Sequence, residues 1–230
     1  RTAQALGAAF AIAREAAAAK KGTTAEDWAT ALVGRTYITA SAGNHGLSVA
    51  AGARIFGANA VIYLAQSVPE AFAARLRAMG ADVVRAGATY EDSMAAAQSA
   101  AESSGTLLSD SSWPGYEDMP LRVMEGYLQM AAETAAQINA VPTHILLQAG
   151  VGGLAGACAA WFRHVWGDAP PIVVVEPDRP PGLLESLRAG RPGAATGPVA
   201  NMWRVDCKVP SLRGLSRPSP ARHLRLCLSS

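Results

Sequence analysis

Short apolar runs alternate along the chain with longer segments in which apolar residues recur every three or four positions. The short runs predict β-strands, and the longer segments predict helices. Strands are expected at residues 37–40, 60–64, 82–85, 106–108, 144–147 and 172–175. Helices are expected at residues 47–56, 69–79, 90–103, 120–138, 154–166 and 183–188, and the chain also starts with a helical pattern. This order predicts an α/β fold with mostly parallel sheets covered by helices.

Two of the expected strands are almost entirely apolar, namely AVIYLA from residue 60 and PIVVVEP from residue 171. A strand that is buried on both faces has this composition, so both are predicted to lie in the interior of a sheet. Prolines are expected in the first turns of helices and glycines just after their last turns. The residues that mark helix ends in this way are Pro69, Pro120, Gly57, Gly80 and Gly105.

The 230 residues are 50% hydrophobic and carry a net charge of +2, with acidic and basic residues interspersed over most of the length. This composition is sufficient for a globular core, and it favours neither a nucleic acid nor a membrane surface as partner. No apolar run reaches the length of about 18 residues that a membrane span needs. The cysteines are few and widely spaced, which argues against a disulfide framework or a metal site. A cytoplasmic protein with a small ligand is therefore expected.

The two ends of the chain differ from the rest. The sequence begins at Arg1 within a helical pattern, which predicts a fragment or a processed form of a longer protein. After Pro210 the segment SLRGLSRPSPARHLRLCLSS contains four arginines and no acidic residue. Because Pro218 and Pro220 interrupt any continuous element, residues 213–230 are predicted to form an irregular basic tail.

Residues 143–162, THILLQAGVGGLAGACAAWF, have the pattern of a strand, a glycine-rich turn and a helix. Such a turn presents consecutive backbone N–H groups at a helix N-terminus, and this arrangement favours phosphate. One alternative is a site for NAD(P), in which Gly150, Gly152 and Gly156 form the turn and Glu176 binds a ribose hydroxyl. Another alternative is a tight turn whose glycines only allow the helix to pack closely on the strand.

A second glycine-flanked motif, SAGNHG at residues 41–46, stands between an expected strand and an expected helix. Together with GVGGLAG from residue 150, it resembles the fold-type II pyridoxal-phosphate enzymes, which include serine and threonine dehydratases and the tryptophan synthase β subunit. Within this group the likeness is strongest to the diaminopropionate ammonia-lyases, through SDSSWPGYEDMPLRVMEGYLQMAAE from residue 109 and PTHILLQAGVGGLAGA from residue 142. The resemblance covers residues 1–211, and members of the family are longer at both ends.

The resemblance implies a pyridoxal 5'-phosphate site built from both motifs. Asn44 corresponds to the asparagine that hydrogen-bonds the 3'-oxygen of the cofactor. The loop around it is expected to bind the substrate carboxylate through backbone N–H groups, and it consists of Ser41, Ala42, Gly43 and His45. The second motif corresponds to the phosphate-binding cup, which consists of Gly150, Val151, Gly152, Gly153 and Leu154. In the alternative interpretation, Asn44 and His45 only cap the following helix.

Asp110 ends the expected strand TLLSD, and it corresponds to an aspartate associated with proton transfer near the α or β carbon of the substrate. A carboxylate at the carboxyl end of a parallel strand lies where ligands bind in such folds. The alternative is a capping or turn aspartate before Trp113 and Pro114. The polar residues at 116–118 are expected to line the entrance.

Two positions depart from the pattern of the family. Gln4 stands where the family has the lysine that forms a Schiff base with the cofactor, and an amide cannot form that bond. The lysines of the chain are Lys20, Lys21 and Lys208, and Lys20 is expected about 24 Å further along the same helix at about 1.5 Å per residue. Ala42 replaces an aspartate that the ammonia-lyases associate with the opposite substrate stereoisomer.

The predicted function is a pyridoxal-phosphate-dependent α,β-elimination of ammonia or water from a small amino acid, such as 2,3-diaminopropionate or a hydroxyamino acid. Because Gln4 replaces the lysine, a second hypothesis is an inactive relative that only binds the cofactor, a phosphate or an amino acid. A NAD(P)-binding protein is the third hypothesis. The family implies a homodimer. It also implies an incomplete cofactor-binding domain at residues 1–46 and 107–212 around a small inserted domain at residues 47–106.

Overall fold

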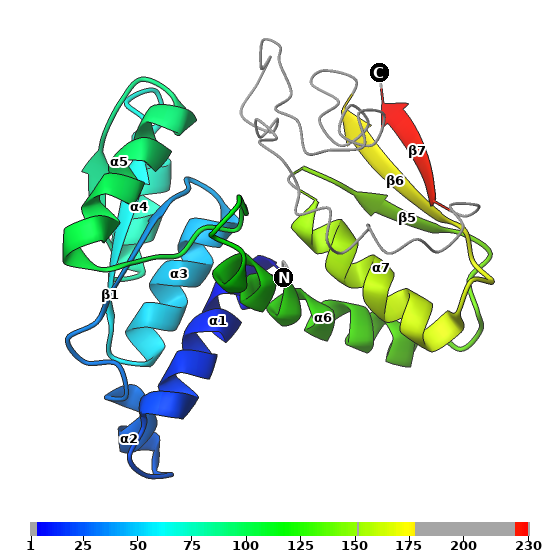
Figure 1. Ribbon diagram of the computed structural model, residues 1–230, viewed down its shortest axis with the longest axis horizontal. Coiled ribbons are helices and arrows are strands. Elements are labelled where there is room, and N and C mark those ends of the chain that lie inside the picture. The colour runs from blue at the N-terminus through cyan, green and yellow to red at the C-terminus, as the bar shows by residue number, and fades with distance from the viewer. Residues whose placement is uncertain (1–3, 151, 178–223, 230) are drawn as a thin grey trace. The chain divides into compact units, whose positions relative to one another are not determined.

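The computed structural model describes residues 4–150, 152–177 and 224–229, with the backbone alone for Gln4, Ala5 and residues 177 and 224–229. The chain forms two compact units, the first ending at Ser109 and the second starting at Asp110 (Figure 1). Each unit has its own parallel sheet. The predicted α/β fold is therefore confirmed, while the expected boundaries of an inserted domain at residues 47–106 stay a prediction.

The first unit contains a parallel four-stranded sheet in the order β3-β2-β1-β4. Its strands are β1 (Thr36–Ala40), β2 (Asn59–Leu64), β3 (Asp82–Arg85) and β4 (Thr106–Leu107). Ile38 of β1 pairs with Val61 of β2 and with Leu107 of β4. Strand β2 lies inside the sheet, as its apolar sequence predicts, and Ile62 and Leu64 are buried. Because all four strands are parallel, their carboxyl ends lie at one edge of the sheet.

Helices cover both faces of this sheet. They are α1 (Gln4–Ala19), α2 (Ala25–Ala29), α3 (Asn44–Ile55), α4 (Glu70–Ala78) and α5 (Tyr90–Ser104). Right-handed connections place α3 and α4 on one face and α5 on the other. Ile38 and Ala40 accordingly pack with Ala97 of α5. Helix α1 lies beside α3 (Figure 1), and a Cβ atom on Gly52 of α3 would come within 2.9 Å of the Ala9 Cα atom.

Glu15 connects α1 to the start of β1. The Tyr37 hydroxyl donates to Glu15 Oε2 at 2.7 Å, and Arg35 Nη1 donates to the same oxygen at 3.0 Å. Burial, followed by the hydrogen bond to Glu15, raises the pKa of Tyr37, so the phenol keeps its proton. Nearer the start of α1, the Ala9 N–H donates to the Ser48 hydroxyl of α3 at 2.9 Å. Helix α1 is therefore fixed to both β1 and α3.

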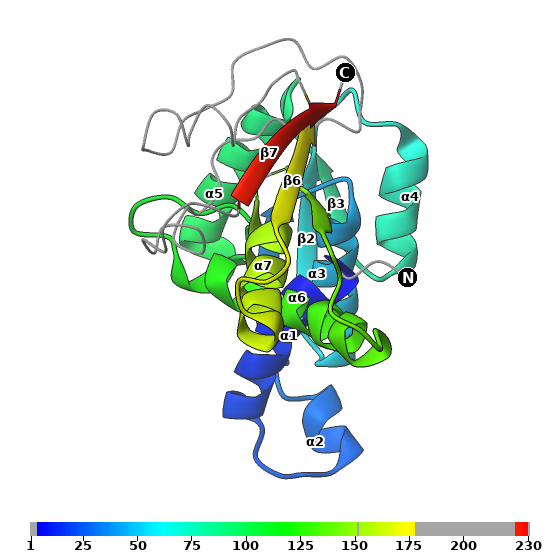
Figure 2. The ribbon, with the colours of Figure 1, turned by 90° about the vertical axis from the view of Figure 1, so that its right-hand side faces the viewer.

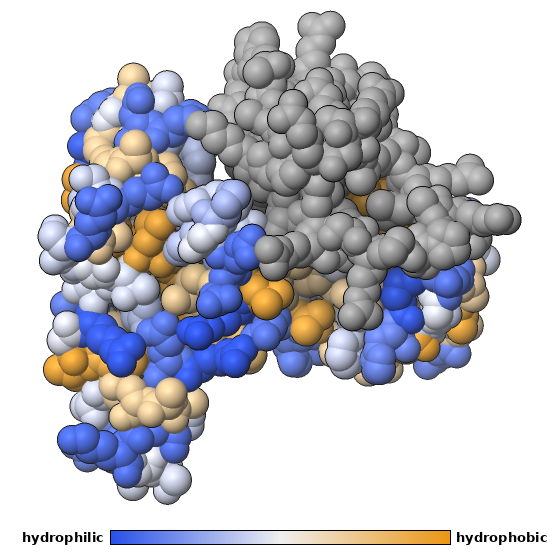
Figure 3. Space-filling model, viewed as in Figure 1, coloured by the Kyte–Doolittle hydropathy of each residue, from blue (hydrophilic) through white to orange (hydrophobic). Residues whose placement is uncertain are grey.

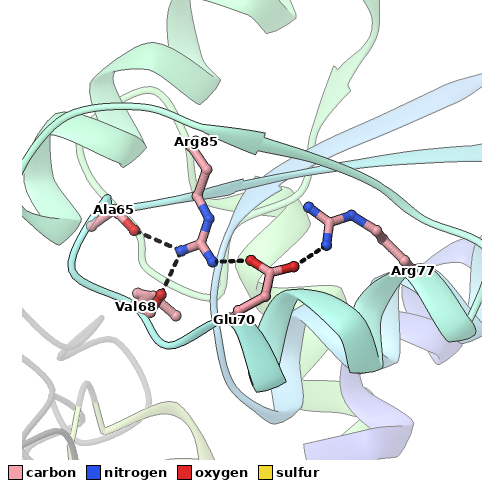
Figure 4. A network of polar contacts seen from close by, with 5 residues as sticks. All are labelled: Ala65, Val68, Glu70, Arg77 and Arg85. Carbon is pink, nitrogen blue, oxygen red and sulfur yellow. Dashed lines mark hydrogen bonds and ion pairs between the residues drawn. The ribbon is translucent and has the colours of Figure 1, made fainter.

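The loop after β2 is held by Arg85, the last residue of β3 (Figure 4). Arg85 Nη1 donates to the carbonyl oxygens of Ala65 and Val68, at 3.0 and 2.6 Å, and Nη2 donates to Glu70 Oε2 at 2.9 Å. Glu70 also forms an ion pair with Arg77 on α4. The hydrogen bonds from Arg85 and then Arg77 lower the pKa of Glu70. The guanidinium of Arg85 thus joins the end of β3 to the loop after β2 and to the start of α4, at the carboxyl edge of the sheet.

The second unit contains a parallel three-stranded sheet in the order β5-β6-β7. Its strands are β5 (Ile145–Gln148), β6 (Ile172–Pro177) and β7 (Leu224–Ser229). Strand β6 is interior, as predicted, and runs beside β7 in the same direction (Figure 2). The helices are α6 (Asp118–Gln137) and α7 (Gly153–Trp166). They pack together over β5, with a core formed by Ala131, Ile145, Cys158, Ala159, Phe162 and Ile172.

Most predicted elements agree with the structure within a few residues, and the differences lie at helix starts. Helix α3 begins at Asn44, three residues before its predicted start, because the polar Asn-His pair belongs to its first turn. Pro69 is the N-cap of α4 and not part of its first turn, whereas Pro120 lies in the first turn of α6 as predicted. Helix α2 was not predicted, although Thr24 and Asp27 form a capping box at its start.

Strand β7 differs from the sequence prediction for its region. It lies within residues 213–230, for which an irregular tail is expected. Leu224, Leu226 and Leu228 recur at every second position, which is a strand pattern that the preceding prolines obscure. The helix predicted at residues 183–188 lies outside the described part of the chain.

On the face of the first unit seen in Figure 3, hydrophilic residues predominate and apolar residues form small groups. Among the helices that the structure describes, none combines the length and apolar character of a transmembrane span. The described residues also contain no group of three or more His, Cys, Asp and Glu side chains placed to hold a metal ion.

Candidate functional site

The loop between β1 and α3 leaves the carboxyl edge of the first sheet, which is where ligands bind in open α/β folds. Gly43 is the N-cap of α3, and as a glycine it has no side chain that could cap the helix. The Gly43 N–H donates to the Ser41 hydroxyl at 3.3 Å, and Asn44 is the first residue of the helix. The N-cap position is therefore held by Gly43 and not by Asn44 or His45. The N–H groups of the first turn can bind an anion.

Gly46 allows this loop to fold back onto its own helix. A Cβ atom on Gly46 would collide with the Ser41 carbonyl oxygen and would lie 3.4 Å from Leu76 Cδ2 of α4. A Cβ atom on Gly43, in contrast, would meet no atom within 4 Å, and Ala42 is partly buried. Packing thus requires the glycine at position 46, while Gly43 borders open space.

The imidazole of His45 is directed toward the end of β4. His45 is 7% exposed, and its Nε2 atom lies 2.9 Å from the Leu108 carbonyl oxygen. Because a carbonyl oxygen only accepts, we assign the proton to Nε2. Nδ1 is buried and has no hydrogen-bond partner within the described part of the chain. The ring therefore supports the loop from inside the protein, and any carboxylate contact of His45 would use its backbone N–H.

Asp110 follows the carboxyl end of β4 and opens the second unit, where it is partly buried. The next helix, α6, has Glu117 as its N-cap. The turn in between is closed by backbone bonds, from the Trp113 N–H to Tyr116 O at 3.3 Å and from the Tyr116 N–H to Trp113 O at 2.9 Å. The two aromatic rings stack with their centroids 4.3 Å apart. Glu117, and not Asp110, is thus the N-cap of α6, and the two backbone bonds of the turn join residues other than Asp110.

Tyr127 of α6 is a residue that sequence reasoning missed. It is 4% exposed, and burial, followed by the negative charge of Asp110, raises its pKa, so the phenol stays neutral. A Cβ atom on Gly153, the first residue of α7, would lie 3.9 Å from Tyr127 Cε2. Tyr127 therefore lies within reach of the charge of Asp110 and beside the start of α7, and all three belong to the second unit. The sequence signal was the spacing of buried positions along α6, at Pro120, Val123, Tyr127 and Ala131.

The glycine-rich turn ends at Gly152, the N-cap of α7. Gly152 has φ 86° and ψ −13°, a left-handed conformation that glycine adopts without strain. Gly152 has no side chain that could cap this helix, and Gly153 and Leu154 are its first two residues. The Gly156 N–H donates to the Gly152 carbonyl at 2.8 Å, as in a regular helix. The first-turn N–H groups therefore point toward a possible anion, and Val151 lies outside the described residues.

The glycines of this turn divide between two roles. A Cβ atom on Gly156 would lie 3.3 Å from Met124 Cε of α6, so Gly156 serves the close packing of α6 and α7. A Cβ atom on Gly150 would meet no atom within 4 Å. The packing interpretation thus accounts for Gly156, while it gives no reason for glycine at position 150.

Three further residues bear on the alternatives. Glu176, which the NAD(P) hypothesis assigns to a ribose hydroxyl, is 0% exposed within β6. Gln4 is the first described residue of α1, and its side chain is not described. Burial raises the pKa of the Cys158 thiol to about 11, so it stays protonated and is a poor nucleophile.

The described groups fit the charged parts of pyridoxal phosphate and of an amino acid. The N-terminus of α7 offers N–H donors to a phosphate, and that of α3 offers them to a carboxylate. The predicted role of Asp110 in proton transfer stays a prediction. The N-terminus of α7 and Asp110 belong to the second unit, and the N-terminus of α3 belongs to the first. The convergence of these groups on one ligand stays a prediction.

Comparison with known proteins gives concordant matches. The chain is 35% identical to a diaminopropionate ammonia-lyase of Salmonella typhimurium over 185 residues, which are 76% of this chain and 46% of that protein. It is 27% identical to a probable D-serine dehydratase of Rhizobium etli over 166 residues, 69% of this chain and 36% of that protein. The crystal structure of the Escherichia coli diaminopropionate ammonia lyase in complex with D-serine has a TM-score of 0.79 at 28% identity, covering 90% of this chain and 55% of that one.

The chain thus spans about half the length of the ammonia-lyases that it matches. The profile of a whole family, described as pyridoxal-phosphate dependent enzyme, matches residues 2–222. This match includes Gln4, the loop before α3, Asp110 and the turn before α7. The chain belongs to the family of pyridoxal-phosphate dependent enzymes.

Proposed function

We propose that this chain is part of an enzyme that removes ammonia or water from a small amino acid by α,β-elimination with pyridoxal phosphate. The relatives named above are an ammonia-lyase and a probable dehydratase, both of which fit this class of reaction. The observation that carries the proposal is the glycine-flanked loop that leaves the carboxyl edge of the sheet after β1 and starts α3 at a glycine N-cap, where a helix N-terminus favours an anion such as a carboxylate. The chain covers half of such relatives, so the proposal concerns the part of the reaction that these residues serve.

The residues of the chain divide the tasks of this reaction. Bound pyridoxal phosphate supplies an electron sink for the pair left when the α-carbon loses its proton. The backbone of residues 41–45 binds the substrate carboxylate, and Asn44 contacts the 3'-oxygen of the cofactor. The turn formed by residues 150–154 binds the phosphate. Asp110 holds or moves a proton at the α or β carbon, and ammonia or water leaves the β carbon with the bonding electrons.

Binding of the cofactor phosphate is tested by a matched pair at Gly150, where a Cβ atom has space. Gly150→Asp adds a negative charge beside the proposed cup, whereas Gly150→Ala adds only a methyl group. At separations of a few ångströms, like charges near a protein surface repel by about 1 to 4 kcal/mol, so Gly150→Asp should bind pyridoxal phosphate at least about tenfold more weakly than Gly150→Ala. Fluorescence titration measures both affinities, and equal affinities would contradict the assignment of the cup.

Gln4 supports a second candidate function, in which the chain binds the cofactor or an amino acid without a covalent link. A cofactor linked to lysine through an imine absorbs visible light, and borohydride bleaches this band by reducing the imine. The amide of a glutamine cannot form such an imine. The wild-type chain is therefore expected to lack this band with added pyridoxal phosphate, and Gln4→Lys is expected to gain it. Formation of a 2-oxo acid from diaminopropionate, serine or threonine then separates an eliminating enzyme from a binding protein. A visible band in the wild type that borohydride bleaches would contradict the assignment of position 4 as the place of the missing lysine.

The dinucleotide hypothesis is no longer favoured, since the family profile supports pyridoxal phosphate. We also propose the fold-type II classification, a homodimer and a cytoplasmic location, which rest on the family resemblance and on the cysteine content. Sedimentation of the purified chain across a range of concentrations tests the dimer.

A further inference from the structure

The hydrogen bond between His45 and Leu108 connects the two segments of the first unit that lead to the proposed chemistry. His45 is the second residue of α3, directly after Asn44, and Leu108 precedes Asp110 by two residues. The atoms are 2.9 Å apart, both residues are buried, and 63 positions separate them in the sequence. A bond of this kind fixes segments that the sheet alone does not connect.

The end of β4 explains why Leu108 needs such a partner. The pairing of β4 with β1 ends at Leu107, opposite Ile38. The Leu108 N–H still donates to the Ile38 carbonyl at 2.8 Å, but its own carbonyl lies past the paired strands. A buried carbonyl without a donor is unfavourable, and the imidazole of His45 supplies that donor. Leu108 is thereby held from β1 on one side and from α3 on the other.

The backbone around His45 has little freedom to respond if this bond is lost. Gly46 is already in close contact with the Ser41 carbonyl oxygen and near Leu76 of α4. The position of His45 thus determines how the loop from Ser41 to Asn44 leaves the sheet. The same ring determines how the chain leaves β4 toward Asp110.

We propose that His45 is a positioning residue, whose Nε2–H bond to the Leu108 carbonyl sets the backbone of the carboxylate-binding loop and the exit of the chain from β4. This inference rests on the proposed function for its consequence in catalysis. It departs from a direct role of the side chain in substrate binding, since the imidazole is engaged inside the first unit. Nδ1, buried and without a described partner, is left as an acceptor in the neutral ring.

A matched pair of substitutions separates the hydrogen bond from the volume of the ring. His45→Gln keeps an N–H donor near the position of Nε2, and His45→Met has nearly the same length and shape without any donor. We expect His45→Met to weaken binding of D-serine to the cofactor-loaded chain about tenfold, because a buried carbonyl then lacks its partner. We expect His45→Gln to recover most of this loss. Affinity for pyridoxal phosphate alone should change less than about threefold in both.

Two readouts do not require activity. Long-range ¹H–¹⁵N spectra of the wild-type chain should show the proton of His45 on Nε2. Amide hydrogen exchange should be faster in His45→Met than in His45→Gln at residues 41–46 and 108–110. A proton on Nδ1, or equal exchange and equal D-serine affinity in the two variants, would overturn the inference. If His45→Met does not fold, the wild-type spectrum and the affinity of His45→Gln still decide.

The outcomes also separate this inference from the proposed function. Faster exchange in His45→Met with no elimination by any variant, including the Gln4→Lys chain, supports the positioning bond and rejects the elimination. Elimination by Gln4→Lys that is unchanged by adding His45→Met rejects the positioning role and supports the function.

Discussion

Helices α3 and α5 follow strands of the same parallel sheet and start at the same edge, yet their N-termini are built in opposite ways. At α5, the Thr89 hydroxyl accepts from the Asp92 N–H at 3.2 Å, and the Asp92 carboxylate accepts from the N–H groups of Thr89 and Ala88, each at 3.0 Å. At α3, the N-cap is Gly43, which has no side chain to cap the helix. The start of α5 is thus capped by its own Thr89 and Asp92, whereas the N-cap of α3 contributes backbone alone.

The difference extends to the charges of the first turns. Helices α2, α4, α5 and α6 each carry at least one acidic residue there, which complements the positive end of the helix dipole. Helices α3 and α7, which bear the two predicted anion sites, carry none. Helix α1 carries none either, so the acidic first turns set α2, α4, α5 and α6 apart from the other helices. At α3 and α7 we propose that a bound anion complements the positive end of the dipole.

The strongest test of this contrast is Gly46→Ala in α3. Its Cβ atom would collide with the Ser41 carbonyl oxygen, so the loop must shift. We expect the free energy of unfolding to fall by about 1 to 3 kcal/mol, as for other overpacked sites, and D-serine binding to fall at least about tenfold. Urea unfolding and ligand titration measure the two effects. Gly43→Ala, where a Cβ has space, is the control, and equal losses in both variants would refute the packing argument.

A second test makes α3 resemble α5. Gly43→Asp introduces a capping carboxylate, which should change the free energy of unfolding by only a few tenths of a kcal/mol relative to glycine. It should nevertheless weaken D-serine binding about tenfold, because the new carboxylate occupies the N–H donors and repels the ligand. Gly43→Asn adds a capping side chain without a charge, so its affinity for D-serine should lie between those of the wild type and Gly43→Asp. Unweakened binding in Gly43→Asp would mean that the substrate carboxylate lies elsewhere.

A third test removes the cap of α5. Thr89→Ala should lower the free energy of unfolding by about 1 kcal/mol, the usual effect of losing an N-cap side chain. Affinities for pyridoxal phosphate and D-serine should stay unchanged, since this helix end serves the fold. Thr89→Ser keeps the hydroxyl and should restore stability in urea unfolding. A ligand affinity that changes with Thr89 would break the contrast between structural and binding helix ends.

The smallest expected effect is a pH dependence at α5. The hydrogen bonds from the Thr89 backbone and hydroxyl, with that from Ala88, lower the pKa of Asp92. Its stabilising contribution is therefore fully present above the ordinary aspartate pKa of about 3.9, and it is lost as the pH falls through the lowered value. Urea unfolding of the wild type and Asp92→Asn should differ most above that range and converge in acid. A difference that grows toward low pH would contradict this sign.

Local signals in the sequence were sufficient for much of the fold. The buried runs at Ile62 and Val174 marked interior strands, and the glycine-flanked turns marked helix starts after β1 and β5. Both signals concern residues that are neighbours in the chain, and they hold because apolar strands and backbone turns form by local rules. The two glycine-rich motifs therefore placed Gly43 and Gly152 at helix starts without information on how the helices pack.

The site could be predicted only in part, because several of its contacts join distant residues. The spacing of Tyr127 on α6 predicts burial, but nothing in the sequence predicts that Asp110 is its charged neighbour. The partner of His45 is a backbone carbonyl at Leu108, and any residue type there would offer the same group. Gly46 resembles the other glycines of the motif in the sequence, and only the folded loop distinguishes it as the one that a Cβ atom would obstruct.

The geometry around Arg85 has a consequence for sequence variation among homologues. Its planar head donates from one nitrogen to two main-chain oxygens and from another to a carboxylate, a fork that the single ammonium of lysine cannot reproduce. An exchange to lysine, usually regarded as mild, would leave either the turn carrying Val68 without its donor or Glu70 with Arg77 as its remaining described partner. Homologues with lysine at this position should consequently carry a compensating change at one of those two places.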